Sequence, residues 1–256
     1  MLWNNMIDFI LGFFAVRKCA ACGKVLSDEE ENAFCFACGE KYEKLKTELC
    51  AICGRTPAYC RCSCAGIFHD IGSDKTLHLF FYDGDFSRSV IYALKNGGKK
   101  RLIDFLSCEL ASLIYLSKGS EDISSYAVTY VPRSRAGIRK YGFDQAKMMA
   151  KRIAWELDIP LVCTLERIGS SSQKAASAKE RARLAEQSYV LADAEISGRK
   201  FIIVDDVITS GSTLHACISL LREAGAERII AATAAKTQHG ENAVGGFASE
   251  EIDFPQ

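Results

Sequence analysis

One segment constrains the fold of this chain more than any other: an apolar run that leads into two carboxylates and then into a turn rich in glycine and hydroxyl groups. Residues 201–204 are bulky or β-branched, which predicts a strand buried on both faces of a parallel sheet. After the turn, Leu214 and Ile218 keep helical spacing until Gly225, which can end a helix in the left-handed conformation. The segment therefore predicts a strand that stops at the carboxylates, then a loop and a helix.

The turn has the chemistry of an anion site. Unpaired backbone N–H groups and the helix dipole favour a phosphate at the start of a helix. Asp205 and Asp206 cannot hold that phosphate, but ionised carboxylates accept hydrogen bonds from a vicinal diol. A ribose 5-phosphate would satisfy both requirements, because its phosphate would bind at the start of the helix and its diol at the two carboxylates. An ordinary strand end with a capped helix uses the same residue types, so this chemistry alone leaves both interpretations open.

The complete segment resembles the thirteen-residue signature for phosphoribosyl pyrophosphate (PRPP) of type I phosphoribosyltransferases. By this resemblance, Asp205 and Asp206 would meet the ribose hydroxyls and form the catalytic pair, and residues 209–213 would cradle the 5-phosphate. The signature would bring these residues to PRPP: Asp205, Asp206, Val207, Thr209, Ser210, Gly211, Ser212 and Thr213. The segment is not a Walker loop, because the Gly-Lys-Ser/Thr ending is missing.

Nine of the twelve cysteines lie between Cys19 and Cys64, largely as Cys-x-x-Cys pairs. This spacing predicts tight knuckles that direct two sulfurs at one tetrahedral metal, and zinc is the expected ion. The candidate ligands are Cys19, Cys22, Cys35 and Cys38 for a first site, and Cys50 and Cys53 with two of Cys60, Cys62 and Cys64 for a second. A disulfide framework is the alternative, but nothing in the sequence indicates secretion, and disulfides are rare in the cytosol.

A local excess of positive charge follows the strand predicted at residues 126–131. Between Arg133 and Arg152, Asp144 is the single acid among seven basic residues. A basic loop between a strand and a helix, beside a phosphate cradle, is suited to neutralising a pyrophosphate. We therefore expect Arg133 and Ser134 to contribute to PRPP binding.

The remaining pattern predicts further strands at 78–82, 159–165 and 228–233, and helices at 86–94, 102–116 and 142–157. The small, polar residues 169–181 form either a lid over the substrate or an idle linker. The formal net charge is zero, so any nucleic-acid contact must come from a local patch. No apolar run reaches the roughly 20 residues of a membrane span. The apolar residues 1–16 include Asp8 and are expected to form a short amphipathic helix, not a secretory signal.

Several features fall in one order along the chain: the cysteine pairs, Leu-Lys-Asn-Gly-Gly at 94–98, Gly-Phe-Asp-Gln-Ala at 142–146, and the signature. Together they resemble the bacterial ComF family of competence-associated, phosphoribosyltransferase-like proteins, which carry an N-terminal zinc ribbon. The resemblance covers roughly residues 15–236, and departs from the family pattern at Tyr141 and Asp144, where Arg and Asn are usual.

The resemblance implies an α/β fold: a type I phosphoribosyltransferase-like, mostly parallel sheet flanked by helices, with an N-terminal double zinc ribbon. We expect the ribbon and its apolar leader at residues 1–66, the phosphoribosyltransferase-like domain at 67–236 and a loose tail at 237–256. Structural Zn²⁺, and Mg²⁺ bound with PRPP, would be the cofactors.

The resemblance also implies a cytoplasmic protein of DNA uptake that binds PRPP and transfers or binds a phosphoribosyl group. As an enzyme it would be a phosphoribosyltransferase, a glycosyltransferase that moves a pentosyl group. The alternative is a non-catalytic PRPP sensor or a single-stranded-DNA-binding factor in natural transformation. A further hypothesis is that the ribbon docks a competence helicase or another DNA-uptake protein. The sequence leaves the acceptor substrate open.

Overall fold

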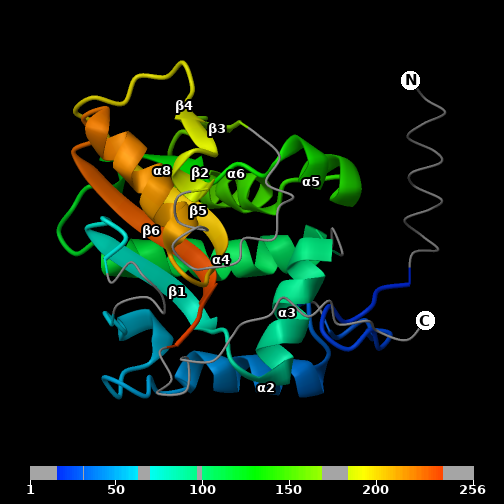
Figure 1. The fold of residues 1–256 in the computed structure, drawn as a ribbon. Helices are drawn as coiled ribbons and strands as arrows, with labels where there is room; N and C mark the ends of the chain where they lie inside the picture. Colours follow the sequence, from blue (N-terminus) through cyan, green and yellow to red (C-terminus); the bar gives the residue numbers. More distant parts are fainter. Residues whose placement is uncertain (1–15, 31, 63–69, 97–99, 169–183, 239–256) are drawn as a thin grey trace.

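The computed structural model describes residues 16–30, 32–62, 70–96, 100–168 and 184–238. Its centre is a sheet of four parallel strands in the order β1-β6-β5-β2 (Figure 1). These strands are β1 (Lys75–Phe81), β6 (Arg228–Lys236), β5 (Lys200–Ile208) and β2 (Tyr126–Tyr130). The predicted parallel α/β sheet is confirmed.

Both faces of this sheet are buried, which explains why its strands are almost uniformly apolar. Successive side chains of β5 alternate between two hydrophobic clusters. Ile202 and Val204 belong to the cluster on one face, whereas Phe201 and Ile203 belong to the cluster on the other. All four side chains are fully buried.

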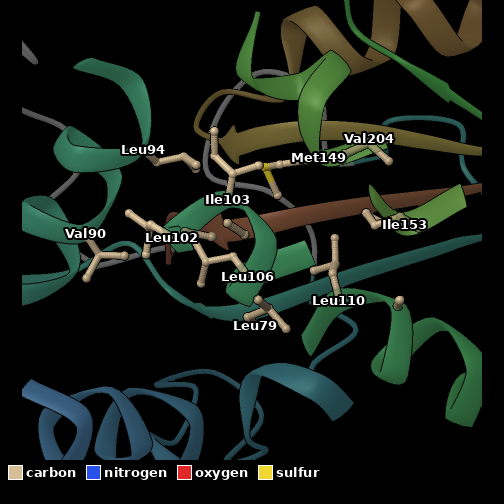
Figure 2. Close-up of a cluster of buried hydrophobic side chains, with 14 of the residues drawn as sticks. Leu79, Val90, Leu94, Leu102, Ile103, Leu106, Leu110, Met149, Ile153 and Val204 are labelled. Atoms are coloured by element: carbon tan, nitrogen blue, oxygen red, sulfur yellow. The ribbon is translucent and has the colours of Figure 1, made fainter. Parts of the chain in front are cut away.

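Helices cover the two faces separately. The first face packs against α3 (Gly84–Asn96), α4 (Lys100–Ser117) and α6 (Gln145–Leu157). Figure 2 shows the centre of this cluster, where side chains of α3, α4 and α6 converge on the sheet. Its labelled members are Leu79, Val90, Leu94, Leu102, Ile103, Leu106, Leu110, Met149, Ile153 and Val204. The opposite face packs against α8 (Ser212–Glu223).

The cysteine-rich segment is joined to the first face. Its helix α2 (Phe36–Thr47) contacts β1, as does the 3₁₀ turn η1 (Pro57–Tyr59). The ring of Tyr42 lies 6.0 Å from that of Phe80 and 5.2 Å from that of Phe105. The Lys46 ammonium also pairs with a Glu109 carboxylate oxygen on α4 at 2.8 Å. The segment therefore shares its core with the sheet.

The predicted strand at 159–165 is wrong. Leu161 makes only an isolated bridge to Val128, and β3 (Leu165–Arg167) pairs instead with β4 (Tyr189–Leu191) in a separate antiparallel sheet. Pro160 lies inside the predicted strand, where it lacks the N–H that a ladder needs.

A short 3₁₀ turn, η2 (Ile123–Ser125), precedes β2.

Some predictions fall on residues outside the described ranges. These are the leader at 1–15, Cys64, the presumed domain junction near residue 66, the polar loop at 169–181 and the tail from 239. Within the described ranges, no helix has the length and apolar character needed to cross a membrane.

His78, in β1, predicts a pH dependence of folding. It is fully buried, and neither ring nitrogen has a hydrogen-bond partner among the described residues. Burial, reinforced by Lys236 and Arg61, lowers the pKa of His78 to about 3. The folded protein therefore keeps His78 neutral, whereas the unfolded chain takes up a proton below about pH 6.5.

We expect His78 to make the protein lose stability as the pH falls from about 6.5 towards 3, by up to about 1.4 kcal/mol per pH unit. Urea unfolding of wild type and His78→Leu at pH 7, 6 and 5, both in excess zinc, measures this. The wild type should show the steeper loss of stability. Equal pH slopes for the two proteins would contradict the assignment.

Candidate functional site

The acidic pair lies inside β5, not after it. The strand continues to Ile208, because Asp205 and Val207 still pair with Thr233 and Ala235 of β6. The prediction of a strand that stops at the carboxylates is therefore wrong by four residues at its end. Successive strand residues point to opposite faces. Asp206 accordingly contacts residues of α3 and α6, whereas Asp205 lies near Tyr189 and Cys217 on the other side.

Asp206 takes part in a chain of polar contacts across the top of the sheet. The amide nitrogen of Gln145 donates to Asp206 Oδ2 at 2.5 Å, and the amide oxygen of Gln145 accepts from Arg133 Nη1 at 2.5 Å. The Lys95 ammonium lies 3.5 Å from the other oxygen of Asp206. Gln145 and Asp206 are both buried, at 7% and 6% exposure, so this chain holds one carboxylate of the pair in a fixed position.

Gln145 and Lys95 were not predicted as site residues. Their signal was present in the sequence, because Gln145 belongs to the Gly-Phe-Asp-Gln-Ala motif and Lys95 to the Leu-Lys-Asn-Gly-Gly motif. The patterns did not show that the two residues meet at Asp206.

The surroundings of Asp205 disfavour its charged form. Burial and the neighbouring Asp206 raise the pKa of Asp205 well above its ordinary value. Burial alone would lower the pKa of Lys95, but Asp206 and Asp205 outweigh it, so the pKa of Lys95 is raised. A cation or a donor of hydroxyl hydrogen bonds would therefore be favoured beside the pair.

The predicted phosphate cradle is a tight turn between β5 and α8. Gly211 caps α8 in the left-handed conformation, with φ of 76°, which strains any residue with a Cβ. Gly211 supplies no side-chain cap, and the Ser212 N–H reaches the Ser210 hydroxyl oxygen at 3.5 Å. Ser210 and Ser212 lie close together, with their hydroxyl oxygens 3.0 Å apart. Val207 is buried in the core, so any contact with a ligand would come from its backbone.

The other predicted cradle residues follow this turn. Thr209 is exposed at its outer side, and Thr213 is partly exposed in the first turn of α8. These positions place the turn and the acidic pair at the same carboxyl edge of the sheet.

The basic segment after β2 forms a short helix, α5 (Arg135–Tyr141), which was not predicted. Ser134 caps it by accepting a hydrogen bond from the Gly137 N–H at 3.0 Å. The Arg133 guanidinium lies 4.1 Å from the ring centroid of Tyr141. Asp144 accepts a hydrogen bond from the backbone N–H of Arg133 at 2.8 Å. Asp144 therefore anchors the loop that carries Arg133.

A pocket of about 360 Å³ lies between α5 and β3. Its lining residues are Ser134, Arg135, Ala136, Arg139, Glu166, Arg167 and Ile168. Three arginines against one glutamate give the pocket a positive balance, which suits an anion. Ser134, which lines the pocket, directly follows Arg133 in the chain. Arg133 is linked through Gln145 to Asp206.

The cysteines gather into two groups. Cys19, Cys22, Cys35 and Cys38 form the first, and Cys50, Cys53, Cys60 and Cys62 form the second; within each group all sulfurs lie within 4.8 Å of one another. Two of these separations are 3.7 Å for Cys22–Cys35 and 3.8 Å for Cys50–Cys62. These fit the edge of about 3.8 Å that four thiolates at 2.3 Å from zinc would form, and are too long for a disulfide.

Both groups could therefore hold zinc, and the structure brings Cys60 and Cys62 to the second one. The described cysteines are free, so the disulfide alternative finds no support there. With four cysteine ligands, a zinc ion in either group would have no open position for chemistry.

Comparison with known proteins shows which proteins this chain is similar to. A model described as the phosphoribosyl transferase domain matches residues 136–248. Competence protein ComFC of Bacillus subtilis is 25% identical over 201 residues, covering 76% of this chain and 80% of the relative. Competence protein ComFC of Streptococcus pneumoniae is 21% identical over 225 residues, covering 83% of this chain and 96% of the relative. These matches support a ComF-type protein with a phosphoribosyltransferase domain.

Among solved structures, the chain is similar to the allosteric regulatory enzyme of purine biosynthesis. The sequence identity is 18% and the TM-score 0.37, and the match covers 56% of this chain and 30% of that one. As a ComF-type protein, this chain combines a phosphoribosyltransferase domain with the two cysteine groups.

Proposed function

We propose that this protein binds PRPP together with Mg²⁺ at the carboxyl edge of the sheet. The observation that carries the proposal is the fixed acidic pair beside the turn that opens α8. Asp205 and Asp206 would accept hydrogen bonds from the ribose hydroxyls, and residues 209–213 would hold the 5-phosphate through backbone N–H and hydroxyl groups. We further propose residues 67–236 as the domain that contains this site.

The pyrophosphate of PRPP would lie towards Arg133 and Ser134. The basic pocket beyond them supports this orientation, because its arginines would offset the charge of the leaving group. Mg²⁺, when bound, would supply further charge neutralisation at the pyrophosphate. The residues of the chain would act by positioning the ribose and by stabilising the charge that develops on the departing pyrophosphate.

In this proposal the protein is a phosphoribosyltransferase, or a PRPP-binding relative of one, that serves competence in the cytoplasm. The single-stranded-DNA alternative has less support. Single-stranded DNA binds through bases stacked on open aromatic rings, but the Tyr141 ring beside the basic loop is in contact with Arg133 and Lys140, at 4.1 and 5.0 Å. A base could stack on that ring only after displacing a cation.

Isothermal titration calorimetry of the zinc-loaded protein with PRPP, with and without Mg²⁺, tests the proposal. We expect saturable binding that Mg²⁺ strengthens, and weaker binding of ribose 5-phosphate, which lacks the pyrophosphate. An acceptor screen for pyrophosphate release would then separate transfer from binding alone. No heat at millimolar PRPP would overturn the proposal.

Gln145 provides a sharper test of the site's architecture. Gln145→Met keeps the length of the side chain but removes both of its hydrogen bonds, to Arg133 and to Asp206. Hydrogen bonds to charged groups contribute about 1.5–3 kcal/mol, so we expect PRPP affinity to fall by about 10- to 100-fold. Calorimetric titration measures the loss.

The matched control is Gln187→Met, because Gln187 is exposed and distant in sequence from the motif. Gln145→Glu should bind PRPP more weakly than Gln145→Met, since it sets a second carboxylate against Asp206. Unchanged affinity in both Gln145 variants would exclude a positioning role.

A further inference from the structure

A buried ammonium group lies where the second cysteine group meets the sheet. Lys236, the last residue of β6, is only 3% exposed, and its Nζ donates a hydrogen bond to the backbone carbonyl of Cys62. Its backbone neighbours across the sheet are Ile208 of β5 and Phe81 of β1. Phe81 in turn packs against Cys50 and Cys60.

A carbonyl does not neutralise this charge. None of the ion pairs in the described part of the chain involves Lys236. The other ionisable neighbours do not help, because Arg61 is itself a cation and His78 is neutral in its buried setting. A buried charge without a counter-charge costs several kcal/mol, so a negative group is expected next to it.

The cysteine group can supply that negative charge. Metal-bound cysteines are thiolates, so four of them around Zn²⁺ carry a net charge of −2. We propose that Lys236 is the positioning residue of the second zinc site, where its ammonium neutralises part of the tetrathiolate charge and fixes the Cys62 backbone. Groups that orient metal ligands typically contribute 10- to 100-fold to metal affinity. This role is independent of PRPP binding.

The same contact ties the metal site to the central sheet. Lys236 lies beside Ile208, two residues beyond Asp206 on the neighbouring strand. The Cys62–Lys236 hydrogen bond joins residues 174 positions apart, whereas the first cysteine group shares a hydrophobic cluster with Phe34 and Tyr42. The first site therefore serves as an internal control for the second.

The test compares zinc release from wild type and Lys236→Met under increasing concentrations of a competing chelator. Pulse alkylation followed by mass spectrometry assigns each release to a site, because only metal-free cysteines are alkylated. We expect Lys236→Met to lose zinc from the second site at a 10- to 100-fold lower chelator concentration than wild type does. The cysteines of the first site, Cys19, Cys22, Cys35 and Cys38, should stay protected from alkylation as in wild type.

Two further variants separate charge from folding effects. Lys236→Arg keeps the positive charge and should retain most of the affinity. Arg61→Ala removes an exposed cation that contacts the Cys60 carbonyl at 3.3 Å, and should have little effect. Equal zinc release from the second site in wild type and Lys236→Met would overturn the proposal. So would loss of both zinc ions together, because that would indicate general unfolding.

Discussion

Replacing Asp205 by asparagine is expected to weaken PRPP binding and, at the same time, to stabilise the folded protein. The pKa of Asp205 is raised by burial and by Asp206, so its ionised form is unfavourable in the folded state at neutral pH. Asparagine removes that charge. Its side-chain oxygen can still accept the hydrogen bond that the Asp206 N–H donates to Asp205 in the wild type, at 2.8 Å. Each kcal/mol relieved should raise Tm by about 2–4 °C in a protein of this size.

The same substitution removes an acceptor that the ribose hydroxyls would use. A hydrogen bond to a charged group contributes about 1.5–3 kcal/mol, so we expect a loss of PRPP affinity of about 10- to 100-fold. With both carboxylates replaced, as Asp205→Asn/Asp206→Asn, the loss should exceed about 100-fold. Calorimetry and thermal unfolding on the same samples measure the two effects.

The control is Asp193→Asn, which removes an exposed carboxylate elsewhere on the chain and should alter neither quantity. A variant that bound PRPP as wild type does would rule out the ribose contact. A decrease in Tm at neutral pH for Asp205→Asn would show that the Asp205 carboxylate is stabilised by its surroundings, against the direction of its pKa shift.

Removing zinc from the first cysteine group should destabilise the sheet and not only the ribbon. Phe34 and Tyr42, next to these cysteines, share one hydrophobic cluster with Phe80 and Phe105 of β1 and α4. Structural zinc contributes about 10–16 kcal/mol in small zinc domains, and the aromatic contacts would be lost with it. We therefore expect the double variant Cys35→Ser/Cys38→Ser to lower Tm by more than about 10 °C.

Hydrogen exchange with mass spectrometry locates the effect. Peptides from β1 and α4 should lose protection in the double variant, whereas Cys163→Ser, at an exposed cysteine outside both groups, should exchange as wild type does. Wild-type protection of β1 and α4 in the metal-free variant would mean that the ribbon is an independent unit.

The parts of the fold that are local in the chain could be predicted from the sequence. The apolar run of β5, the helical spacing of α8 and the left-handed stop at Gly225, where φ is 87°, are all present as predicted. The first cysteine group also consists of the four predicted cysteines. The failures occurred where neighbours overrode local preference. β5 extends through two aspartates because β6 pairs with it there, and residues 159–165 fail as a sheet strand at Pro160.

The strand-turn-helix unit, the acidic pair beside its turn and the paired cysteines could all be predicted from the amino-acid sequence, because periodicity and spacing are properties of neighbouring residues. Which distant groups meet depends on the three-dimensional fold. It brought Gln145 to Asp206 across 61 positions, Lys236 to Cys62 across 174, and Cys60 with Cys62 to the second metal group. Such contacts depend on strand order and on burial, which together limit the hydrogen-bond partners available to a buried polar group. No pattern of neighbouring residues specifies those partners.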